Sequence, residues 1–420
     1  MKKSFRSILC CLLIVACVFC TASCMPSDFL LGGNTQEDGS NDIPNGATVN
    51  VSGGDNYNVT IEGTTSSTVA AANKALLSAV SIVSTFEGTN SGWIGGFGGS
   101  SDSSTSASSG SGVIYKLDKN NGVAYVITNH HVVYDASSGI SNNIKVFLYG
   151  QEGYTDCAMS ATYVGGSLSY DIAILKITGS TTLMSSIATA ATFADSNKVA
   201  VLDTVVAIGN AQGSGISATV GYVNVESEYI TLTGADEKTE INIRVIRTDA
   251  AVNPGNSGGG LFNEKGEVIG IVNAKSASDS VDNIGYAIPS NVAKSIAENI
   301  IHYCDNTTKS CVYRCMLGIS ITSENPSVAY DTATGKLYKR EDVTISEVTG
   351  TALKGKLQAG DILKSITIDG KKIDITLRHH VVDSMLDARE GSSVTITFER
   401  GGQVKDVTVT ITSSMIEAYK

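Results

Sequence analysis

The sequence predicts a mainly β protein with two folded parts, and three observations support that prediction. The chain has 420 residues, which is more than one compact core usually organises, and 42% of them are apolar. Glycine is abundant, whereas proline and aromatic residues are scarce. Short runs rich in Val, Ile and Thr alternate with polar residues and are separated by turns that contain Gly, a pattern typical of β-strands.

The N-terminal end of the chain predicts export. Three of the first six residues are basic, and they precede an apolar stretch over 8–19 that is too short to span a bilayer comfortably. Small residues follow and end at Cys24. This order resembles a bacterial lipoprotein signal, which implies a signal peptide over 1–24, lipidation of Cys24 and an extracytoplasmic chain anchored to the cell membrane. Ordinary secretion and an uncleaved anchor are the alternatives.

The region before the first strands combines a spacer, a helix and a loop. Residues 25–68 are rich in Gly, Asn, Ser, Thr and Asp, which predicts a flexible, solvated spacer because such a segment cannot bury a core. Alternation over 48–51 and 57–61 predicts one small hairpin inside it. Residues 69–83 predict a short helix that leads into a first strand. Gly and Ser dominate 88–110, which predicts a long flexible loop.

Strand follows strand from Ser111 to about Pro289. The predicted strands are Gly112–Lys116, Val123–Thr128, Asn143–Tyr149, Ile172–Ile177, Thr204–Ile208, Thr219–Val225, Ile243–Thr248, Gly260–Phe262 and Val268–Val272. Short, evenly spaced strands joined by turn residues are typical of closed barrels or sandwiches. An amphipathic segment over 290–303, capped by Ser290 and Asn291, predicts the helix that ends this first part, 69–303.

A second, smaller part follows a polar linker over 304–313. Residues 314–420 predict a small α+β module. Its predicted strands are Met316–Ile321, Val343–Val348, Ile362–Ile368, Val394–Glu399 and Val404–Ile411, with a helix at His380–Arg389.

Charge and cysteine content argue against two classes of function. The formal net charge of −11 disfavours nucleic-acid binding, because phosphate repels an acidic chain. Five of the nine cysteines lie in the leader, which leaves Cys157, Cys304, Cys311 and Cys315. These residues, with His302 nearby, show no paired Cys-x-x-Cys spacing. We therefore expect a local disulfide or free thiols, no metal and no cofactor.

A glycine-rich turn at 253–259, Asn-Pro-Gly-Asn-Ser-Gly-Gly, holds the candidate nucleophile, Ser257. A serine flanked by glycines before a strand has an exposed hydroxyl and open backbone N–H groups, and acyl transfer needs both. We expect the oxyanion hole in the N–H groups of Gly255, Asn256 and Ser257, with Gly255 and Ser257 as the two principal donors. The alternative is a glycine-rich turn with an incidental serine.

The base and its orienting carboxylate are predicted from two strand ends. His130 and His131 directly follow a strong strand, so they face a loop that can border a cleft. Asp171 immediately precedes the apolar strand at 172–177, where a carboxylate can be held and partly desolvated. Taken alone, an Asp before a strand is usually a turn residue. However, His, Asp and Ser occur here in the chain order of chymotrypsin-like proteases, which predicts a double β-barrel for the first part.

These motifs together resemble the HtrA (high-temperature-requirement, or Deg) family of trypsin-like serine proteases. The matching pieces are T-N-H-H-V-V, D-I-A-I-L-K-I, A-I-G-N-A-Q-G, R-T-D-A-A-V-N-P-G-N-S-G-G-G-L, V-I-G-I-V and G-Y-A-I-P, in family order. The resemblance implies an exported serine endopeptidase that degrades misfolded or partly unfolded envelope proteins, and a homotrimer by analogy. It places the catalytic histidine at His131, whereas the family usually has Asn where His130 stands.

The second part resembles a PDZ domain, the peptide-binding module that often follows an HtrA protease. The resemblance rests on Met-Leu-Gly-Ile at 316–319, Leu-Gln-Ala-Gly-Asp-Ile-Leu at 357–363 and Ile-Asp-Gly at 368–370. It implies that the loop of Leu317, Gly318 and Ile319 binds the carboxylate of a peptide C-terminus. The alternative is a plain small β module with an ordinary turn.

Cleavage specificity is predicted from the resemblance of the first part to chymotrypsin-like proteases. Ala251, six residues before Ser257, lies at the base of the primary specificity pocket, and Asn273 and Lys275 lie near its wall. Because Ala251 offers no charge partner for Lys or Arg, we expect cleavage after small or medium apolar residues. Two other functions remain open: a chaperone or peptide-binding protein whose triad is largely idle, and an esterase, which the chain order disfavours.

Overall fold

The computed structural model describes residues 48–52, 58–62, 66–87, 105–273, 284–304 and 312–419. Residues from Ala47 onward form one compact unit. The predicted signal peptide with Cys24, and also Lys275 and Cys311, lie outside the described residues. In the ranges given above, no helix has the length and apolar character needed to cross a membrane.

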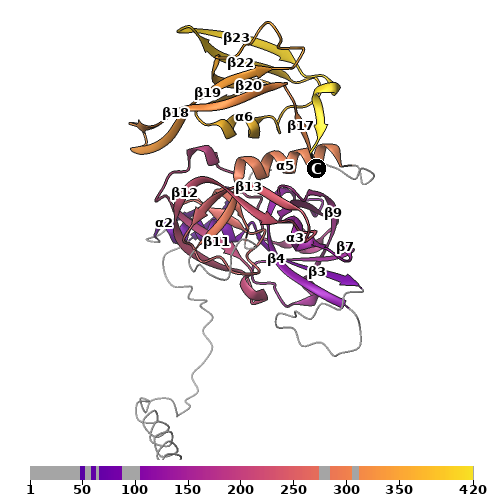
Figure 1. Ribbon diagram of the computed structural model, residues 1–420. Coiled ribbons are helices and arrows are strands. Elements are labelled where there is room, and N and C mark those ends of the chain that lie inside the picture. The colour runs from indigo at the N-terminus through magenta and orange to yellow at the C-terminus, as the bar shows by residue number, and fades with distance from the viewer. Residues whose placement is uncertain are drawn as a thin grey trace, which may run out of the picture. The chain divides into compact units, whose positions relative to one another are not determined.

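The first folded region is a closed barrel of six antiparallel strands (Figure 1). In barrel order the strands are β10 (Ile172–Ile177), β5 (Val123–Thr128), β4 (Thr105–Asp118), β3 (Ala79–Glu87), β8 (Asn143–Leu148) and β9 (Met159–Ser167). The strands predicted in this region are confirmed, and β9 is an addition. The predicted loop 88–110 ends earlier than expected, because residues from Thr105 onward already pair with β3.

The second region is another closed barrel of six strands, so the predicted double barrel is confirmed. In barrel order its strands are β11 (Thr204–Gly209), β12 (Ser217–Thr233), β13 (Glu240–Thr248), β16 (Gly285–Pro289), β15 (Val268–Val272) and β14 (Gly260–Phe262). All five residues of β15 are buried, as expected of a strand whose two faces are both covered.

Within the described residues, five α-helices and two short hairpins complete the fold. The helices with one or more turns are α2 (Ser67–Leu76), α3 (His130–Val133), α4 (Thr181–Ser185), α5 (Ser290–Tyr303) and, in the C-terminal part, α6 (Arg378–Ser384). The hairpins pair β1 (Thr48–Ser52) with β2 (Asn58–Glu62), as predicted, and β6 (Tyr134–Asp135) with β7 (Gly139–Ile140).

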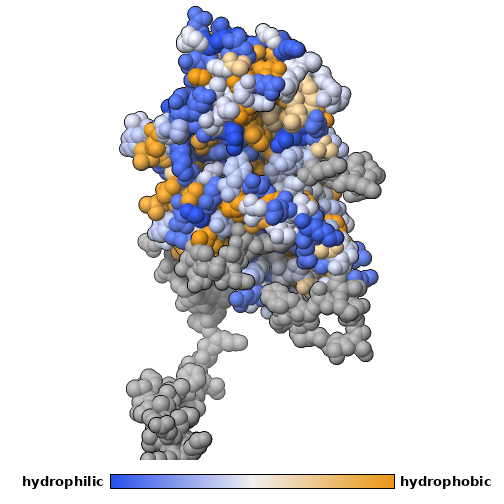
Figure 2. Space-filling model, in the orientation of Figure 1, coloured by the Kyte–Doolittle hydropathy of each residue, from blue (hydrophilic) through white to orange (hydrophobic). Residues whose placement is uncertain are grey.

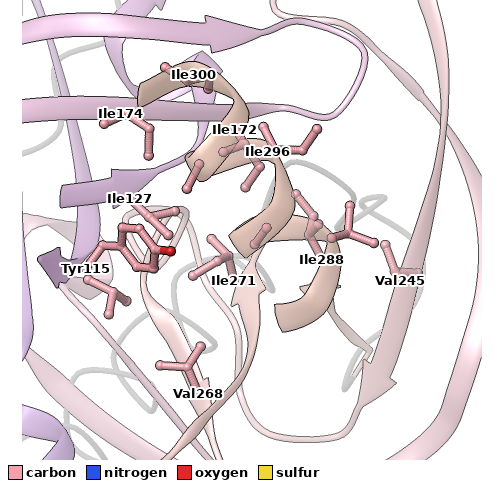
Figure 3. Packing of buried hydrophobic residues seen from close by; sticks show 14 of the residues in the cluster. Tyr115, Ile127, Ile172, Ile174, Val245, Val268, Ile271, Ile288, Ile296 and Ile300 are labelled. Atoms are coloured by element: carbon pink, nitrogen blue, oxygen red, sulfur yellow. The ribbon is translucent and has the colours of Figure 1, made fainter. Parts of the chain in front are cut away.

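Helix α5 packs into the core shared by the two barrels. Figure 3 shows Ile296 and Ile300 of this helix beside Ile172 of the first barrel and Ile288 of the second, and all four side chains are at most 1% exposed. The predicted cap at Ser290 is wrong, because the hydroxyl of Ser290 instead donates to the carbonyl of Ala194 at 2.7 Å. The helix is therefore held by tertiary contacts rather than by a local cap.

The C-terminal part is a second sheet with its own core. Its strands are β18 (Ile319–Asp331), β19 (Lys336–Val348), β20 (Ile362–Ile368), β22 (Ser393–Arg400) and β23 (Gln403–Thr410), in that order, with β21 (Lys371–Asp374) paired to β20. A two-stranded clip joins β17 (Tyr313–Cys315) to β24 (Ile416–Ala418). The predicted boundaries at 303 and 314 stay predictions.

The hairpin of β18 and β19 is longer than predicted and extends beyond its sheet (Figure 1). Val328, Tyr330 and Leu337 on it are each more than 60% exposed. Figure 2 shows such hydrophobic residues coming to the surface in separate patches among hydrophilic ones. Because its side chains bury little apolar area, the pairing of this hairpin rests mainly on its backbone ladder.

Candidate active site

The pairing of β5 with β10 brings His131 and Asp171 together. Ala173 lies opposite Thr128 in the antiparallel register, so the end of β5 meets the start of β10. His131 Nδ1 lies 2.7 Å from Asp171 Oδ2, and the backbone N–H of His131 donates to Oδ1 of the same carboxylate at 3.0 Å. These two hydrogen bonds, one from the ring and one from the backbone of His131, fix the position and the tilt of the imidazole. A catalytic base needs a fixed orientation because it must present its Nε2.

Asp171 is held in a special backbone conformation. Its φ is +50°, in the left-handed region that Asp and Asn tolerate better than most side chains. Its carbonyl accepts a bond from Asn129 Nδ2 at 2.8 Å, and its side chain is almost fully buried. Burial alone would raise the pKa of Asp171, but the charge and hydrogen bonds of His131 hold it below its ordinary value.

The neighbouring His130 occupies a different environment. It is 7% exposed and stacks on Tyr134 with ring centroids 5.1 Å apart. Its Nδ1 is buried without a hydrogen-bond partner among the described residues. Burial lowers the pKa of His130 to about 4. The geometry therefore supports His131, not His130, as the residue that can serve as base.

The turn that holds Ser257 lies against the end of β5. A Cβ at Gly258 would come within 2.3 Å of Thr128 Oγ1 and 3.0 Å of Asn129 N. Gly258 has φ +85°, so both its conformation and this close approach require glycine. The chain leading to His131 and the serine turn are thereby packed backbone to backbone, although His131 and Ser257 are 126 positions apart in the sequence.

The predicted oxyanion donors are not equivalent. The N–H of Asn256 donates to the carbonyl of Asn253 at 2.9 Å, so this residue is wrong as a predicted donor: its amide is already used inside the turn. Gly255 has φ +98°, and its carbonyl accepts a bond from Ser111 Oγ at 2.7 Å. Because the Asn256 amide is engaged, Gly255 and Ser257 stay the predicted donors.

The side chain of Asn273 has a role that the sequence did not suggest. Expected at the wall of the specificity pocket, it is 1% exposed, and its Nδ2 donates to Asp171 Oδ2 at 2.9 Å. The prediction for this side chain is therefore corrected: it binds the carboxylate and cannot also face a substrate. Ala251 is exposed and Lys275 lies outside the described residues, so their places in the specificity pocket stay predictions.

Ser111 is a second residue that sequence reasoning missed. It is fully buried; its N–H donates to the carbonyl of Ser257 at 2.8 Å, and its hydroxyl accepts from Asn210 N at 2.7 Å while donating to Gly255. A first-barrel residue thus holds the serine turn of the second barrel. The only sequence sign was a small polar residue at the start of a strand.

The predicted carboxylate-binding loop has the conformation of a tight turn. Gly318 has φ +66°, and a Cβ there would lie 2.4 Å from the Cα of Gly350. Its carbonyl accepts bonds from the N–H groups of Thr349 and Gly350, both at 2.8 Å. Leu317 is buried, and Ile319 begins β18, which is an edge strand of its sheet as far as the structure is described. The loop is therefore rigid beside an open sheet edge.

The described cysteines differ in their bonding state. Cys304 is disulfide-bonded, while Cys157 and Cys315 are free thiols. Burial raises the pKa of Cys315 to about 11, so this thiol stays protonated. Within the part of the chain that the structure describes, no three His, Cys, Asp or Glu residues gather into a metal-binding group.

The chain is similar to known serine proteases. The trypsin-like peptidase domain family matches residues 110–271. Serine protease Do-like HtrA of Bacillus subtilis (strain 168) is 37% identical over 324 residues, which cover 75% of this chain and 66% of that protein. Serine protease Do-like HtrA of Lactococcus lactis subsp. cremoris (strain MG1363) is 34% identical over 340 residues, covering 76% and 75%. Among solved structures, the HtrA-type protease AlgW with decapeptide aligns with a TM-score of 0.48 at 26% identity, covering 82% of this chain and 98% of that one.

Proposed function

Because the chain belongs to the HtrA family of serine proteases, we propose that it is a serine endopeptidase in which Ser257, His131 and Asp171 cooperate. The contact of 2.7 Å between His131 Nδ1 and Asp171, beside the turn of Ser257, is the observation that carries this proposal. The barrels supply the two halves of the site, since Ser257 follows β13 of the second barrel and the other two residues flank β5 and β10 of the first.

The reaction follows from these positions. Ser257 Oγ attacks the scissile carbonyl carbon while its proton passes to His131 Nε2, and Asp171 stabilises the imidazolium that results. The N–H groups of Gly255 and Ser257 stabilise the oxyanion. When the tetrahedral intermediate collapses, the leaving amine takes the proton from His131 and an ester on Ser257 remains. A water then gives a proton to His131 and attacks the ester, which releases the acid and returns the proton to Ser257.

The substrates we propose are misfolded or partly unfolded polypeptides. An extended chain is needed to enter a site formed between two barrels, and folded proteins offer few such segments. Ala251 at the pocket base carries no charge, so cleavage should follow small or medium apolar residues. A digest that cuts mainly after Lys or Arg would contradict this specificity.

The C-terminal part, in this proposal, is a PDZ-like module that holds substrate C-termini. Support comes from the rigid turn at Gly318 beside the edge strand β18, which a peptide can extend by backbone pairing. A peptide with a free C-terminal carboxylate should therefore bind more tightly than the same peptide amidated at its C-terminus, as titration calorimetry would show. Equal affinity of the two peptides would remove the carboxylate-loop role.

Outside the cytoplasm is the location we propose, with lipidation at Cys24 as the anchor and a homotrimer as the assembly. The Escherichia coli (strain K12) relative DegP is named a periplasmic serine endoprotease, and the basic and apolar leader of this chain fits export. Metabolic labelling with a palmitate analogue tests the anchor, since Cys24→Ser should abolish the label. Light scattering of the purified chain tests the trimer.

Hydrolysis of fluorescein-labelled casein tests the central proposal. Ser257→Ala should lose hydrolysis almost completely, whereas Ser138→Ala, at an exposed serine in the β6–β7 turn, should match the wild type. Residual activity of Ser257→Ala equal to that of the wild type would assign the cleavage to another residue. A wild type that binds unfolded casein without cleaving it would instead favour the chaperone alternative.

A further inference from the structure

Tyr170, the residue directly before Asp171, touches a residue from the far end of the chain. Its ring centroid lies 5.0 Å from that of Tyr419, with 39° between the ring planes, and a hydrogen bond links the two side chains. The pair joins the segment before β10 to the segment after β24. A contact between residues 249 positions apart, one of them adjacent to the orienting carboxylate, links the C-terminal module to the site.

The turn that contains Tyr170 and Asp171 makes the contact with Tyr419. It lies between β9 and β10, where no strand ladder fixes it, and Asp171 adopts φ +50°. Two long hydrogen bonds lie inside the turn, from Tyr170 N to Ser167 Oγ and from Asp171 N to Leu168 O, both 3.3 Å. Tyr170 packs against the core cluster that contains Ile172. Movement of its ring would therefore shift the adjacent Asp171.

Tyr419, by contrast, is firmly held. Its N–H donates to the carbonyl of Val312 at 2.8 Å, which continues the β17–β24 clip. The guanidinium of Arg314 lies over its ring, 4.6 Å from the centroid. Asn299 of α5 is fully buried and holds the clip through bonds with Tyr313 N at 2.8 Å and Tyr313 O at 3.0 Å. The clip is thus fixed to the same helix that packs into the core of both barrels.

We propose that Tyr419 is a positioning residue for Asp171: its ring braces Tyr170 and so keeps the carboxylate in place for His131. This inference rests on the proposed triad. It gives the C-terminal clip a part in catalysis that is separate from peptide binding at the carboxylate loop. It also means that integrity of the clip, and not only of the barrels, sets the turnover number.

The test compares Tyr419→Leu, Tyr419→Phe and Tyr330→Leu in the full chain, with fluorescein-labelled casein as substrate. Reactive sites are titrated with a fluorophosphonate, so that kcat is expressed per competent Ser257. Tyr330 is a matched control, since it is an exposed tyrosine of the same C-terminal part. Tyr419→Leu should lower kcat per site about 10-fold with KM within about twofold, because misplacing a catalytic group by a fraction of an ångström costs turnover rather than binding.

The conservative and control variants complete the pattern. Tyr419→Phe keeps the ring and should retain kcat within about twofold, while Tyr330→Leu should equal the wild type. A merely structural role for Tyr419 would reduce the number of titrated sites and leave kcat per site unchanged, and that result overturns the inference. If Tyr419→Leu is not recovered folded, Arg314→Met replaces it, with an expected fall of about threefold in kcat per site.

Failure of the inference and failure of the proposed function give different results. A wild type whose activity disappears in Ser257→Ala, together with an unchanged kcat in Tyr419→Leu, rejects only the positioning role. Full activity of Ser257→Ala rejects the proposed triad, and the positioning role with it.

Discussion

Removing the side-chain amide of Asn273 is the sharpest test of how Asp171 is held. The carboxylate accepts three hydrogen bonds: from His131 Nδ1 at 2.7 Å, from His131 N at 3.0 Å and from Asn273 Nδ2 at 2.9 Å. Asn273→Ala deletes the third one and leaves the other two. Since Asp171 is 3% exposed, water has little access to replace the missing donor.

The expected magnitude follows from the charge on the acceptor. A hydrogen bond to a buried charged group contributes about 1.5–3 kcal/mol, and about 1.4 kcal/mol corresponds to a tenfold change in rate. If Asp171 must be in place to stabilise the imidazolium, most of this loss falls on the transition state. We therefore expect kcat to fall about 10- to 100-fold, with KM almost unchanged, because the Asn273 side chain does not reach the substrate.

Casein hydrolysis at pH 8 with titrated active sites measures this effect, and Asn263→Ala is the matched control. Asn263 Nδ2 also donates to a carboxylate at 2.9 Å, that of Glu267, in the turn between β14 and β15. This control should keep its kcat even if its melting temperature falls. The reasoning is refuted if Asn273→Ala raises KM or changes cleavage specificity while kcat is retained, since that outcome would return Asn273 to the pocket wall.

Four further predictions concern residues around the site and the contact with the C-terminal part. Asp171→Asn should lower kcat about 10⁴-fold. Because the pKa of Asp171 is held low, its ionised form also stabilises the fold above about pH 4. The unfolding free energies of the wild type and the variant, measured by urea titration, should therefore converge as the pH falls below that value. Ser111→Ala removes the hydroxyl that binds the Gly255 carbonyl and the Asn210 N–H, and it should lower the unfolding free energy by about 1–3 kcal/mol. It should also lower kcat/KM by the corresponding factor, at about 1.4 kcal/mol for each tenfold change. Arg244→Met removes the partner of the partly buried carboxylate of Asp383, and Asp383→Asn leaves the buried guanidinium of Arg244 without its counter-charge, so each variant should cost about 3–5 kcal/mol in urea unfolding. His130→Asn should keep the fall of kcat/KM at acid pH, and loss of that fall would make His130 the base. The variant should also gain stability relative to the wild type as the pH falls from about 6.5 to 4, because in that range the unfolded chain binds a proton at His130 and the folded chain does not.

The barrel strands were predictable because their sequence pattern is local. Apolar runs such as Ile172–Ile177 and Val268–Val272 are buried strands in the structure, and turn residues separate them as expected. The hairpin of β18 and β19 was underestimated for the opposite reason. Its distal residues, from Glu324 to Tyr330, are largely exposed on both faces, so they show no alternation between apolar and polar positions. Backbone pairing and ion pairs such as that of Lys336 with Asp203 hold this hairpin, and neither leaves a periodic pattern in the sequence.

The contacts that hold the site were not predictable, because barrel closure creates them. Asn273 lies 102 positions from Asp171, and Ser111 lies 144 positions from Gly255. No local pattern distinguishes an asparagine that binds a carboxylate from one that lines a pocket. The strand order that brings these residues together depends on the packing of the whole core, which sequence periodicity does not specify.

The two adjacent imidazoles show how the fold, rather than the residue type, assigns chemistry. His130 and His131 share one short helix and one sequence context, yet their side chains leave it in different directions. One forms a hydrogen bond with the carboxylate of Asp171; the other is enclosed by Tyr134 and Tyr163, where burial outweighs the attraction of the Asp171 charge and lowers its pKa. A base must accept a proton during the reaction, and only an imidazole next to a carboxylate can do so at low cost. The carboxylate of Asp171 therefore selects the base, and whatever holds Asp171, including Asn273 and the brace of Tyr170 by Tyr419, controls how well that base works.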